Sequence, residues 1–154
     1  MDIIDQEILM HMQENAKLSM TAIGKLIGMS QPAVTERVKR LEEQGIITTY
    51  RTVVDKEKIG KSTVAFLLYR TMQCTDFVEY CANSPQVAEC HRISGDFNYL
   101  IKVIVESTKE LELFENEIIK YGDYSKTLIS LSSPIEYKPI IPSDKVLKDL
   151  NKLA

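Results

Sequence analysis

The sequence has no excess of positive charge. Its 19 lysine and arginine residues are matched by 22 aspartate and glutamate residues, which gives a net charge of −3. A domain that binds nucleic acid is usually basic, so charge alone does not predict such a partner. The first 60 residues are close to neutral as well. Any contact with nucleic acid must therefore use a local patch, and the best candidate is the arginine- and lysine-containing stretch 37–51.

The sequence also lacks a long hydrophobic run. Its longest uncharged apolar stretch, VAFLLY at 64–69, is far shorter than the roughly 20 residues that a helix needs to cross a bilayer. The N-terminal stretch MDIIDQEIL contains acidic residues and no basic region, unlike a secretory signal peptide. We therefore expect a soluble protein of the cytoplasm.

Residues suited to catalysis or metal binding are scarce. The three cysteines, Cys74, Cys81 and Cys90, match no metal-ligand spacing. The two histidines are far apart, and there is neither a Ser/His/Asp set nor a glycine-rich phosphate loop. Cys90 and His91 are adjacent, but neighbouring strand residues point to opposite faces, so we expect a buried cysteine and an exposed histidine. These absences predict that the chain is not an enzyme and that it binds no metal and no cofactor.

The first 45 residues have the periodicity of helices. Ile4, Ile8 and Met12 form one apolar stripe, and Ser19 is suited to cap a second helix that ends at Gly28. Two helices separated by a turn of three or four residues that contains glycine are typical of a helix-turn-helix. The residues expected to face inward in the second helix are Met20, Ile23, Leu26 and Ile27.

The third predicted helix has a polar face that its own core does not use. Val34, Val38 and Leu41 form its apolar face, Ser30 is a good N-cap, and Gly45 suits the position just past its end. The polar face consists of Gln31, Pro32, Thr35, Glu36, Lys39 and Arg40. Such a face is either simply solvated or enters a groove of DNA, and the pattern alone leaves both interpretations open.

The stretch after this helix alternates β-branched and polar residues. The sequence IITTYRTVVD at 46–55 predicts a two-stranded wing or a linker strand. Together with the three helices it forms a predicted winged helix-turn-helix domain over residues 1–60.

From Lys61 onward the elements follow the order β-α-β-β-α-β. This order is that of a ferredoxin-like domain, with an antiparallel sheet and both helices on one face, and it predicts an α+β protein. The domain is expected over 61–141. Its expected strands are 62–70, 86–94, 98–106 and 126–137, and its expected helices are 74–84 and 108–122. The residues expected to face inward from the helices are Phe77, Val78, Cys81, Leu111, Phe114, Ile118 and Ile119.

Two of these strands are apolar at nearly every position. The stretches 64–69 and 99–105 do not alternate as strands with one wet face would. We therefore expect both faces of the sheet to be covered, one by helices and the other by the same sheet of a second subunit. Such a dimer would place two DNA-binding helices about one helical turn apart and double the phosphate contacts.

From Ile3 to about Ile140 the sequence resembles the Lrp/AsnC, or feast/famine, transcriptional regulators of bacteria and archaea. The most specific part is S-x-x-x-V-x-x-R-V-x-x-L-E-x-x-G-I-I at 30–47, and ISGDFNYLIKV at 93–103 resembles the Gly-x-(Tyr/Phe)-Asp turn of the family's effector domain. The resemblance implies a homodimer, often assembled into tetramers or octamers. It also implies operator binding through the third helix, modulated by an amino acid held between effector domains of neighbouring dimers.

The resemblance also implies site residues. Thr35 and Gln31 are suited to base edges, and Arg37 serves either the DNA backbone or the fold. The full set expected to contact DNA is Ser30, Gln31, Pro32, Thr35, Glu36, Arg37, Lys39, Arg40 and Arg51. The set expected to bind an effector is Gly95, Asp96, Asn98, Tyr99 and Thr127.

The sequence departs from the family pattern at three places. Asn98 stands where the family usually has Asp, and Ile129 stands where a second Thr is common, so a different ligand or none is also expected. The tail 142–154 extends beyond the usual family end, and Ser143 is suited to cap a short helix there. Two rival functions stay open: a ligand-independent architectural protein that wraps DNA, and a metabolite-sensing accessory domain without DNA binding.

Overall fold

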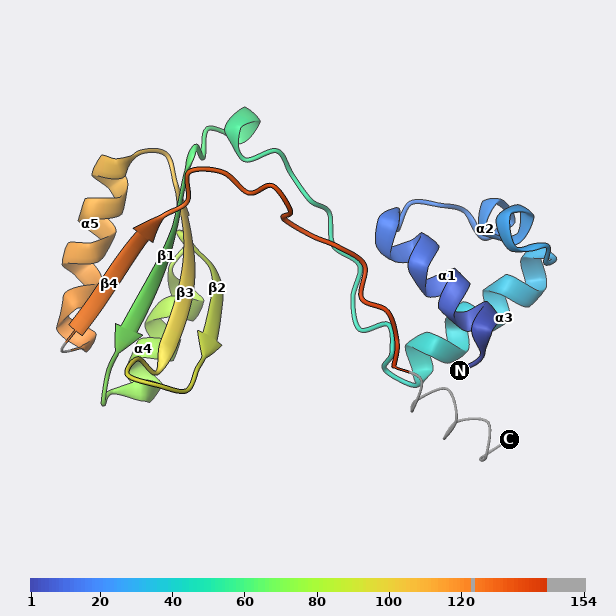
Figure 1. The fold of residues 1–154 in the computed structure, drawn as a ribbon, viewed down its shortest axis with the longest axis horizontal. Coiled ribbons are helices and arrows are strands. Elements are labelled where there is room, and N and C mark those ends of the chain that lie inside the picture. Colours follow the sequence, from blue (N-terminus) through green and yellow to red (C-terminus); the bar gives the residue numbers. More distant parts are fainter. Residues whose placement is uncertain (123, 144–154) are drawn as a thin grey trace. The chain divides into compact units, whose positions relative to one another are not determined.

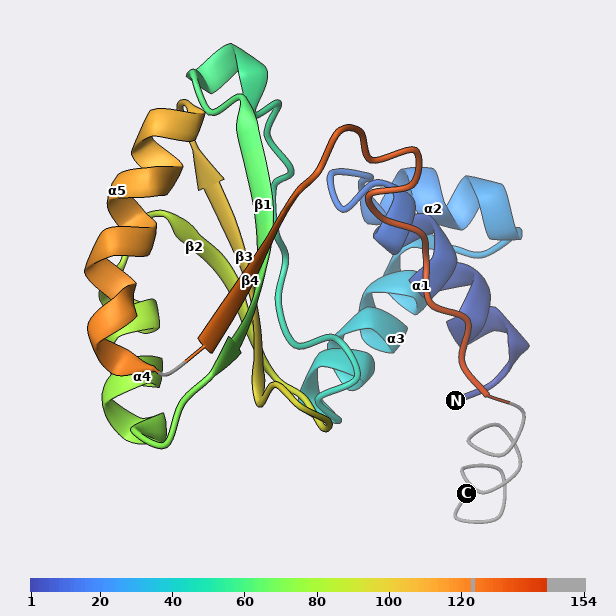
Figure 2. The same cartoon turned by 60° about the vertical axis from the view of Figure 1, so that its left-hand side comes forward.

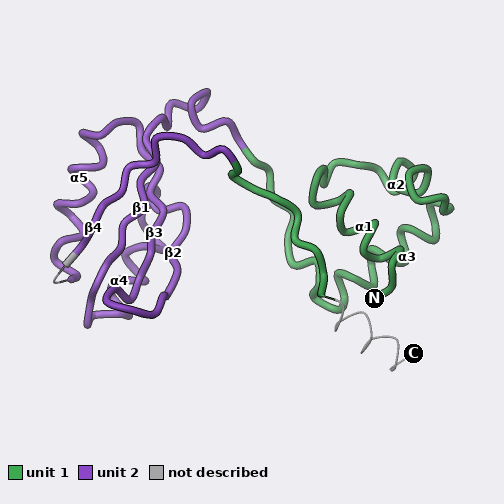
Figure 3. The backbone as a smooth tube through the Cα atoms, viewed as in Figure 1, with its two compact units in different colours: residues 1–53, 135–154 green, residues 54–134 purple. Residues whose placement is uncertain are grey.

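The computed structural model describes residues 1–122 and 124–143 and contains two compact units (Figures 1 and 3). The first unit comprises residues 1–53 together with the described part of the C-terminal segment from Ile135. The second comprises Val54–Pro134. The helix expected from Ser143 onward lies outside the described residues. In the part of the chain that is described, no helix is both long and apolar enough to cross a bilayer.

The first unit is built from the three predicted helices, α1 (Ile3–Glu14), α2 (Met20–Ile27) and α3 (Gln31–Glu43). Ser19 caps α2, because its hydroxyl accepts a hydrogen bond from Ala22 N at 3.1 Å. α2 ends at Gly28, whose φ of 73° is the left-handed conformation that glycine adopts without strain. The helix-turn-helix expected from the sequence is therefore confirmed.

The core of this unit follows the predicted stripes with one exception. The buried side chains are Ile8, Leu9, Met12, Ile23, Val34, Val38 and Leu41. Leu26 was expected to face inward but is 59% exposed. The inward face of α2 instead includes Gly24, which is buried against the turn before α3. Ile23, Met20 and Ile27 face the core as expected, and only the position of Leu26 was wrong, because a glycine gives no apolar signal for the face that it occupies.

The prediction of a wing or linker strand at 46–55 is wrong, because no strand forms there. The segment is irregular from Ile46 to Asp55, and within the described residues no strand pairs with it. β-Branched residues favour an extended backbone, but a strand also requires a partner for its hydrogen bonds.

The C-terminal segment packs on the first unit through the side chain of Gln13 on α1. Gln13 Nε2 donates to Ile140 O at 3.0 Å, and Gln13 Oε1 accepts from Ile140 N at 2.9 Å. The hydroxyl of Tyr137 donates to the same oxygen at 3.1 Å. The amide of Gln13 therefore pairs with the backbone at Ile140 much as a neighbouring strand would.

The second unit is a four-stranded sheet with two helices. The strands are β1 (Thr63–Arg70), β2 (Val87–Arg92), β3 (Tyr99–Val105) and β4 (Tyr124–Ile129), in the order β2-β3-β1-β4. All neighbouring strands are antiparallel. The helices α4 (Cys74–Asn83) and α5 (Thr108–Ile118) cover the same face (Figure 2). Two short 3₁₀ helices, η1 (Glu57–Ile59) and η2 (Ile119–Tyr121), flank these elements. The ferredoxin-like topology is confirmed.

Three details of this unit differ from the prediction. Val78 and Ile119 were expected to face inward but are 43% and 68% exposed. Val78 lies about 100° around the helix from the buried Phe77, and Ile119 lies where α5 tightens into η2. β4 ends at Ile129 and does not extend to residue 137, because Ile129 already pairs with Ala65 near the start of β1.

The second face of the sheet is apolar, and no helix of the described part of this unit covers it. Residues buried under the helices alternate along β1 and β3 with half-buried residues that point the other way. The apolar residues on this open face include Val64, Phe66, Leu68, Leu100, Ile104 and Leu128. Lys102 lies among them and pairs with Glu89 at 2.9 Å. The sequence predicted this second apolar face correctly.

Candidate DNA-binding surface and ligand-domain turn

The polar face of α3 is exposed along its whole length. All six of its predicted members are exposed, namely Gln31, Pro32, Thr35, Glu36, Lys39 and Arg40. Gln31 Nε2 donates to Thr35 Oγ1 at 2.9 Å, which aligns these two side chains. Ser30 is the N-cap as predicted, but its hydroxyl makes no capping hydrogen bond. Arg51, in the irregular segment after α3, is also exposed.

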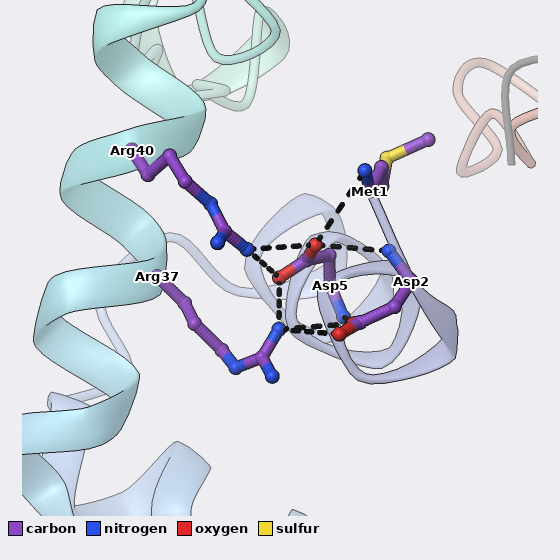
Figure 4. A network of polar contacts seen from close by, with 5 residues as sticks. All are labelled: Met1, Asp2, Asp5, Arg37 and Arg40. Carbon is purple, nitrogen blue, oxygen red and sulfur yellow. Dashed lines mark hydrogen bonds and ion pairs between the residues drawn. The ribbon is translucent and has the colours of Figure 1, made fainter. Parts of the chain in front are cut away.

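Two arginines of α3 are held by acidic residues at the start of α1 (Figure 4). Arg37 NH1 lies 2.8 Å from Asp2 Oδ2 and 2.7 Å from Asp5 Oδ1. Arg40 NH2 lies 3.1 Å from Asp5 Oδ2. The side chain of Asp5 is 1% exposed, whereas those of Arg37 and Arg40 are 22% and 49% exposed. Arg37 is therefore part of the fold, and Arg40 keeps about half of its surface in solvent.

The same acidic residues also begin α1. Asp2 Oδ1 accepts from Asp5 N at 2.9 Å, and Asp5 Oδ2 accepts from Asp2 N at 2.9 Å, which forms a reciprocal capping box. Burial raises the pKa of Asp2, but the hydrogen bonds from Asp5 N and Arg37 outweigh it and hold the pKa below its ordinary value. The pKa of Arg37 is raised by its hydrogen bonds to Asp5 and Asp2.

Sequence reasoning missed this cluster, although its spacing contains a signal. The acids stand three residues apart at 2 and 5, and the arginines stand three residues apart at 37 and 40. On a helix, residues three apart lie on the same face, so both pairs can meet across a helix contact. Spacing does not reveal which two helices pack together, and so the pairing is evident only in the structure.

A surface groove of about 480 Å³ runs beside α3 in the same unit. Its apolar residues include Met12, Met20 and Val38, and Tyr50, which also lines it, donates to Glu42 at 2.6 Å. Burial and this hydrogen bond to a carboxylate raise the pKa of Tyr50 to about 12. Tyr50 therefore remains a neutral donor at physiological pH.

The turn between β2 and β3 contains three of the predicted effector residues, and a fourth, Tyr99, begins β3. Gly95 has a φ of 120°, which glycine tolerates best, and Asp96 is exposed. Asn98 is occupied within the chain, because its Nδ2 donates to Thr71 O at 2.7 Å and its Oδ1 accepts from Thr71 N at 3.0 Å. Tyr99 is 4% exposed, and its ring lies 4.8 Å from that of Phe77. In one chain, Asn98 and Tyr99 thus serve the fold.

Thr127 lies apart from this turn. It is on β4 opposite Leu67, and its hydroxyl donates to Glu115 Oε1 on α5. β1 lies between β4 and β3 in the sheet, so one chain does not bring Thr127 together with the turn at 95–99. Cys90 was expected in the core but is exposed on the edge strand β2, and His91 is exposed as expected.

Comparison with known proteins gives two family matches that together span most of the chain. Residues 1–42 match the AsnC-type helix-turn-helix domain, and residues 64–140 match the Lrp/AsnC ligand binding domain. The HTH-type transcriptional regulator YezC of Bacillus subtilis is 41% identical over 133 residues, which cover 86% of this chain and 95% of YezC.

Solved structures show the same architecture. The structure of B. subtilis LrpC is 31% identical, has a TM-score of 0.84, and is matched over 89% of this chain and 99% of LrpC. The crystal structure of the transcriptional regulator NMB0573 from Neisseria meningitidis in complex with L-Met has a TM-score of 0.88 at 20% identity, over 96% of this chain and 99% of that one. At that identity the second comparison concerns the fold alone. From its two matched domains and its relatives, this chain belongs to the Lrp/AsnC family of transcriptional regulators.

Proposed function

We propose that the chain regulates transcription by placing the exposed face of α3 in the major groove of operator DNA. The observation that carries this proposal is a helix-turn-helix whose second helix, α3, has a polar face made entirely of exposed residues. Proteins of this type present the N-terminal residues of that helix to base edges. Gln31 and Thr35 are suited to base edges, and Lys39, Arg40 and Arg51 are suited to phosphates.

The start of α3 supplies the rest of the proposed surface. Glu36 is suited to accept a hydrogen bond from a cytosine amino group. The Ser30 hydroxyl makes no capping bond, so it and the helix N-terminus are suited to a phosphate, with Pro32 beside them. Arg37 is assigned a supporting role, because its guanidinium is held by Asp2 and Asp5.

We further propose that the protein acts as a homodimer formed through the open face of its sheet, and that dimers assemble further. A contiguous apolar sheet face that no helix of its own unit covers is typical of an interaction surface, and a second copy of the same sheet would bury it symmetrically. Dimerisation also compensates for the near-neutral charge of the chain, because two α3 helices share the phosphate contacts. The proposed compartment is the cytoplasm, where operator DNA is accessible.

The proposed effector is an amino acid or a similar small molecule bound between subunits. The turn at 95–99 would contribute the backbone of Gly95 and the carboxylate of Asp96, and Thr127 would come from a neighbouring subunit. The engagement of Asn98 by Thr71 favours an alternative, in which the protein wraps DNA without an effector.

Selection of duplexes from a random library, followed by fluorescence anisotropy at fixed salt, tests the proposal. We expect a selected duplex to bind at least about 10³-fold more tightly than a scrambled one. Gln31→Ala and Thr35→Ala should relax the preference for particular bases. Lys39→Ala and Arg51→Ala should instead weaken binding to every sequence, and each should reduce the slope of log affinity against log salt concentration by about one. Absence of binding at low salt would overturn the proposal.

The same titration distinguishes the two forms of the proposal. We repeat it in the presence of each of the twenty amino acids. If an effector site exists, one class of amino acid should change the affinity of the protein for DNA. A small difference between selected and scrambled duplexes, with no response to any amino acid, would favour the architectural alternative.

A further inference from the structure

One buried carboxylate contacts both arginines of α3. Asp5 is 1% exposed and accepts from Arg37 NH1 at 2.7 Å, from Arg40 NH2 at 3.1 and 3.2 Å, and from Asp2 N at 2.9 Å (Figure 4). Removing a carboxylate from water costs free energy, so a buried carboxylate is found only where charged donors surround it. The cluster therefore fixes the position of the α3 arginines relative to α1.

The two arginines differ in how much of the guanidinium remains available to a ligand. Arg40 is 49% exposed and uses a single nitrogen, NH2, for Asp5. A guanidinium has five N–H donors in a rigid plane, so Arg40 retains donors that Asp5 does not engage, on a side chain that is half exposed. By contrast, Lys39 forms an exposed pair with Glu43 at 3.5 Å, and an exposed pair of this kind holds a side chain only weakly.

Building on the proposed DNA-binding role of α3, we propose that Asp5 is a positioning residue for DNA binding. Its carboxylate holds the guanidinium of Arg40 in one orientation, with the remaining donors directed outward for a phosphate. A long side chain that is already ordered loses less freedom on binding, which corresponds to about a two- to tenfold gain in affinity. Asp5 itself does not touch the DNA.

The test compares Asp5→Asn, Arg40→Ala and the double variant in the full chain, by anisotropy with the selected duplex between about 50 and 200 mM salt. Asp5→Asn keeps the shape of the side chain and removes its charge. We expect Arg40→Ala to bind more weakly and to lower the slope of log affinity against log salt by about one, as loss of one phosphate contact does. Asp5→Asn should weaken binding about two- to tenfold with little change in this slope, because Arg40 can still reach the phosphate but is no longer held in place for it. The double variant should bind like Arg40→Ala, because Asp5 acts through Arg40.

Glu7→Gln is the matched control, because Glu7 is an exposed acid on the same helix. Measurements are made below the melting temperature of every variant, so that each is folded. Tighter binding by Asp5→Asn would overturn the inference, because it would mean that Asp5 competes with phosphate for Arg40. An equal loss of affinity when Asp5→Asn is made in the Arg40→Ala background would also overturn it, because Asp5 would then act through the fold and not through Arg40. Failure of the unmodified chain to bind DNA would instead refute the proposed function.

Discussion

At the scale of single residues, Asn98 shows how an apparent ligand residue serves the fold. Its amide both donates to and accepts from the backbone of Thr71, at the point where β1 has ended and β3 begins. Only a side chain with a donor and an acceptor can make both bonds, so Asn fits here and Asp does not. The departure from the family pattern at this position therefore has a structural explanation.

Asn98→Asp should destabilise the chain by about 1–3 kcal/mol at neutral pH. A carboxylate can still accept from Thr71 N, but it places an acceptor against Thr71 O, which then lacks its donor. Urea unfolding followed by circular dichroism measures the change. Asp96→Asn is the control, because Asp96 is exposed on the same turn. Equal stability of Asn98→Asp and the parent chain would contradict this account.

At the scale of elements, the helix-turn-helix depends on a close approach at Gly24. A Cβ atom at this position would lie 2.5 Å from Met29 O, in the turn that leads into α3. Backbone cannot give way as the end of a flexible side chain can. The absence of a side chain at Gly24 therefore sets how closely the turn packs on α2.

Gly24→Ala should destabilise the first unit by about 1–3 kcal/mol, despite the better helix propensity of alanine, because the turn must move. We expect operator affinity to fall as well, since α3 begins only a few residues beyond the contact. Thermal unfolding and anisotropy measure both effects. Lys25→Ala, at an exposed neighbouring position, should change stability by less than about 0.5 kcal/mol. Unchanged stability and operator affinity in Gly24→Ala would contradict this account, because it would mean that the turn can move without cost.

Much of this element structure could be predicted from the sequence, because local chemistry determines it. The caps at Ser19 and Gly28, the apolar face of α3 and the order of the strands all follow from spacing and turn preference. The missing wing and the early end of β4 could not be predicted, because strand formation depends on a partner. The Asp5 cluster could not be predicted for a related reason, because it depends on which helices pack against each other.

At the scale of the whole molecule, the open sheet face determines assembly. Leu68 and Leu100 are cross-strand partners on this face, and both are half-buried in a single chain. We expect Leu68→Glu to yield a monomer by light scattering coupled to size exclusion, because an unpaired charge in an apolar interface is strongly unfavourable. Its salt slope for DNA should fall to about half.

Leu113→Glu provides the control for this prediction. Leu113 is a leucine exposed to 57% on α5, on the opposite side of the sheet. The dimer should persist in that variant. Loss of the dimer in both variants, or in neither, would indicate that the subunits meet elsewhere.

The pairing of Gln13 with Ile140 has a consequence for how the chain can be divided. The ligand-domain unit is an insertion: the chain leaves the DNA-binding unit after Val53 and rejoins it at Ile135. A fragment that stops at the linker would leave the amide of Gln13 without its backbone partner and omit a piece of its own domain. Because residues 1–53 and the described segment from Ile135 belong to one unit, a DNA-binding fragment with its full set of contacts requires both of these segments of the chain.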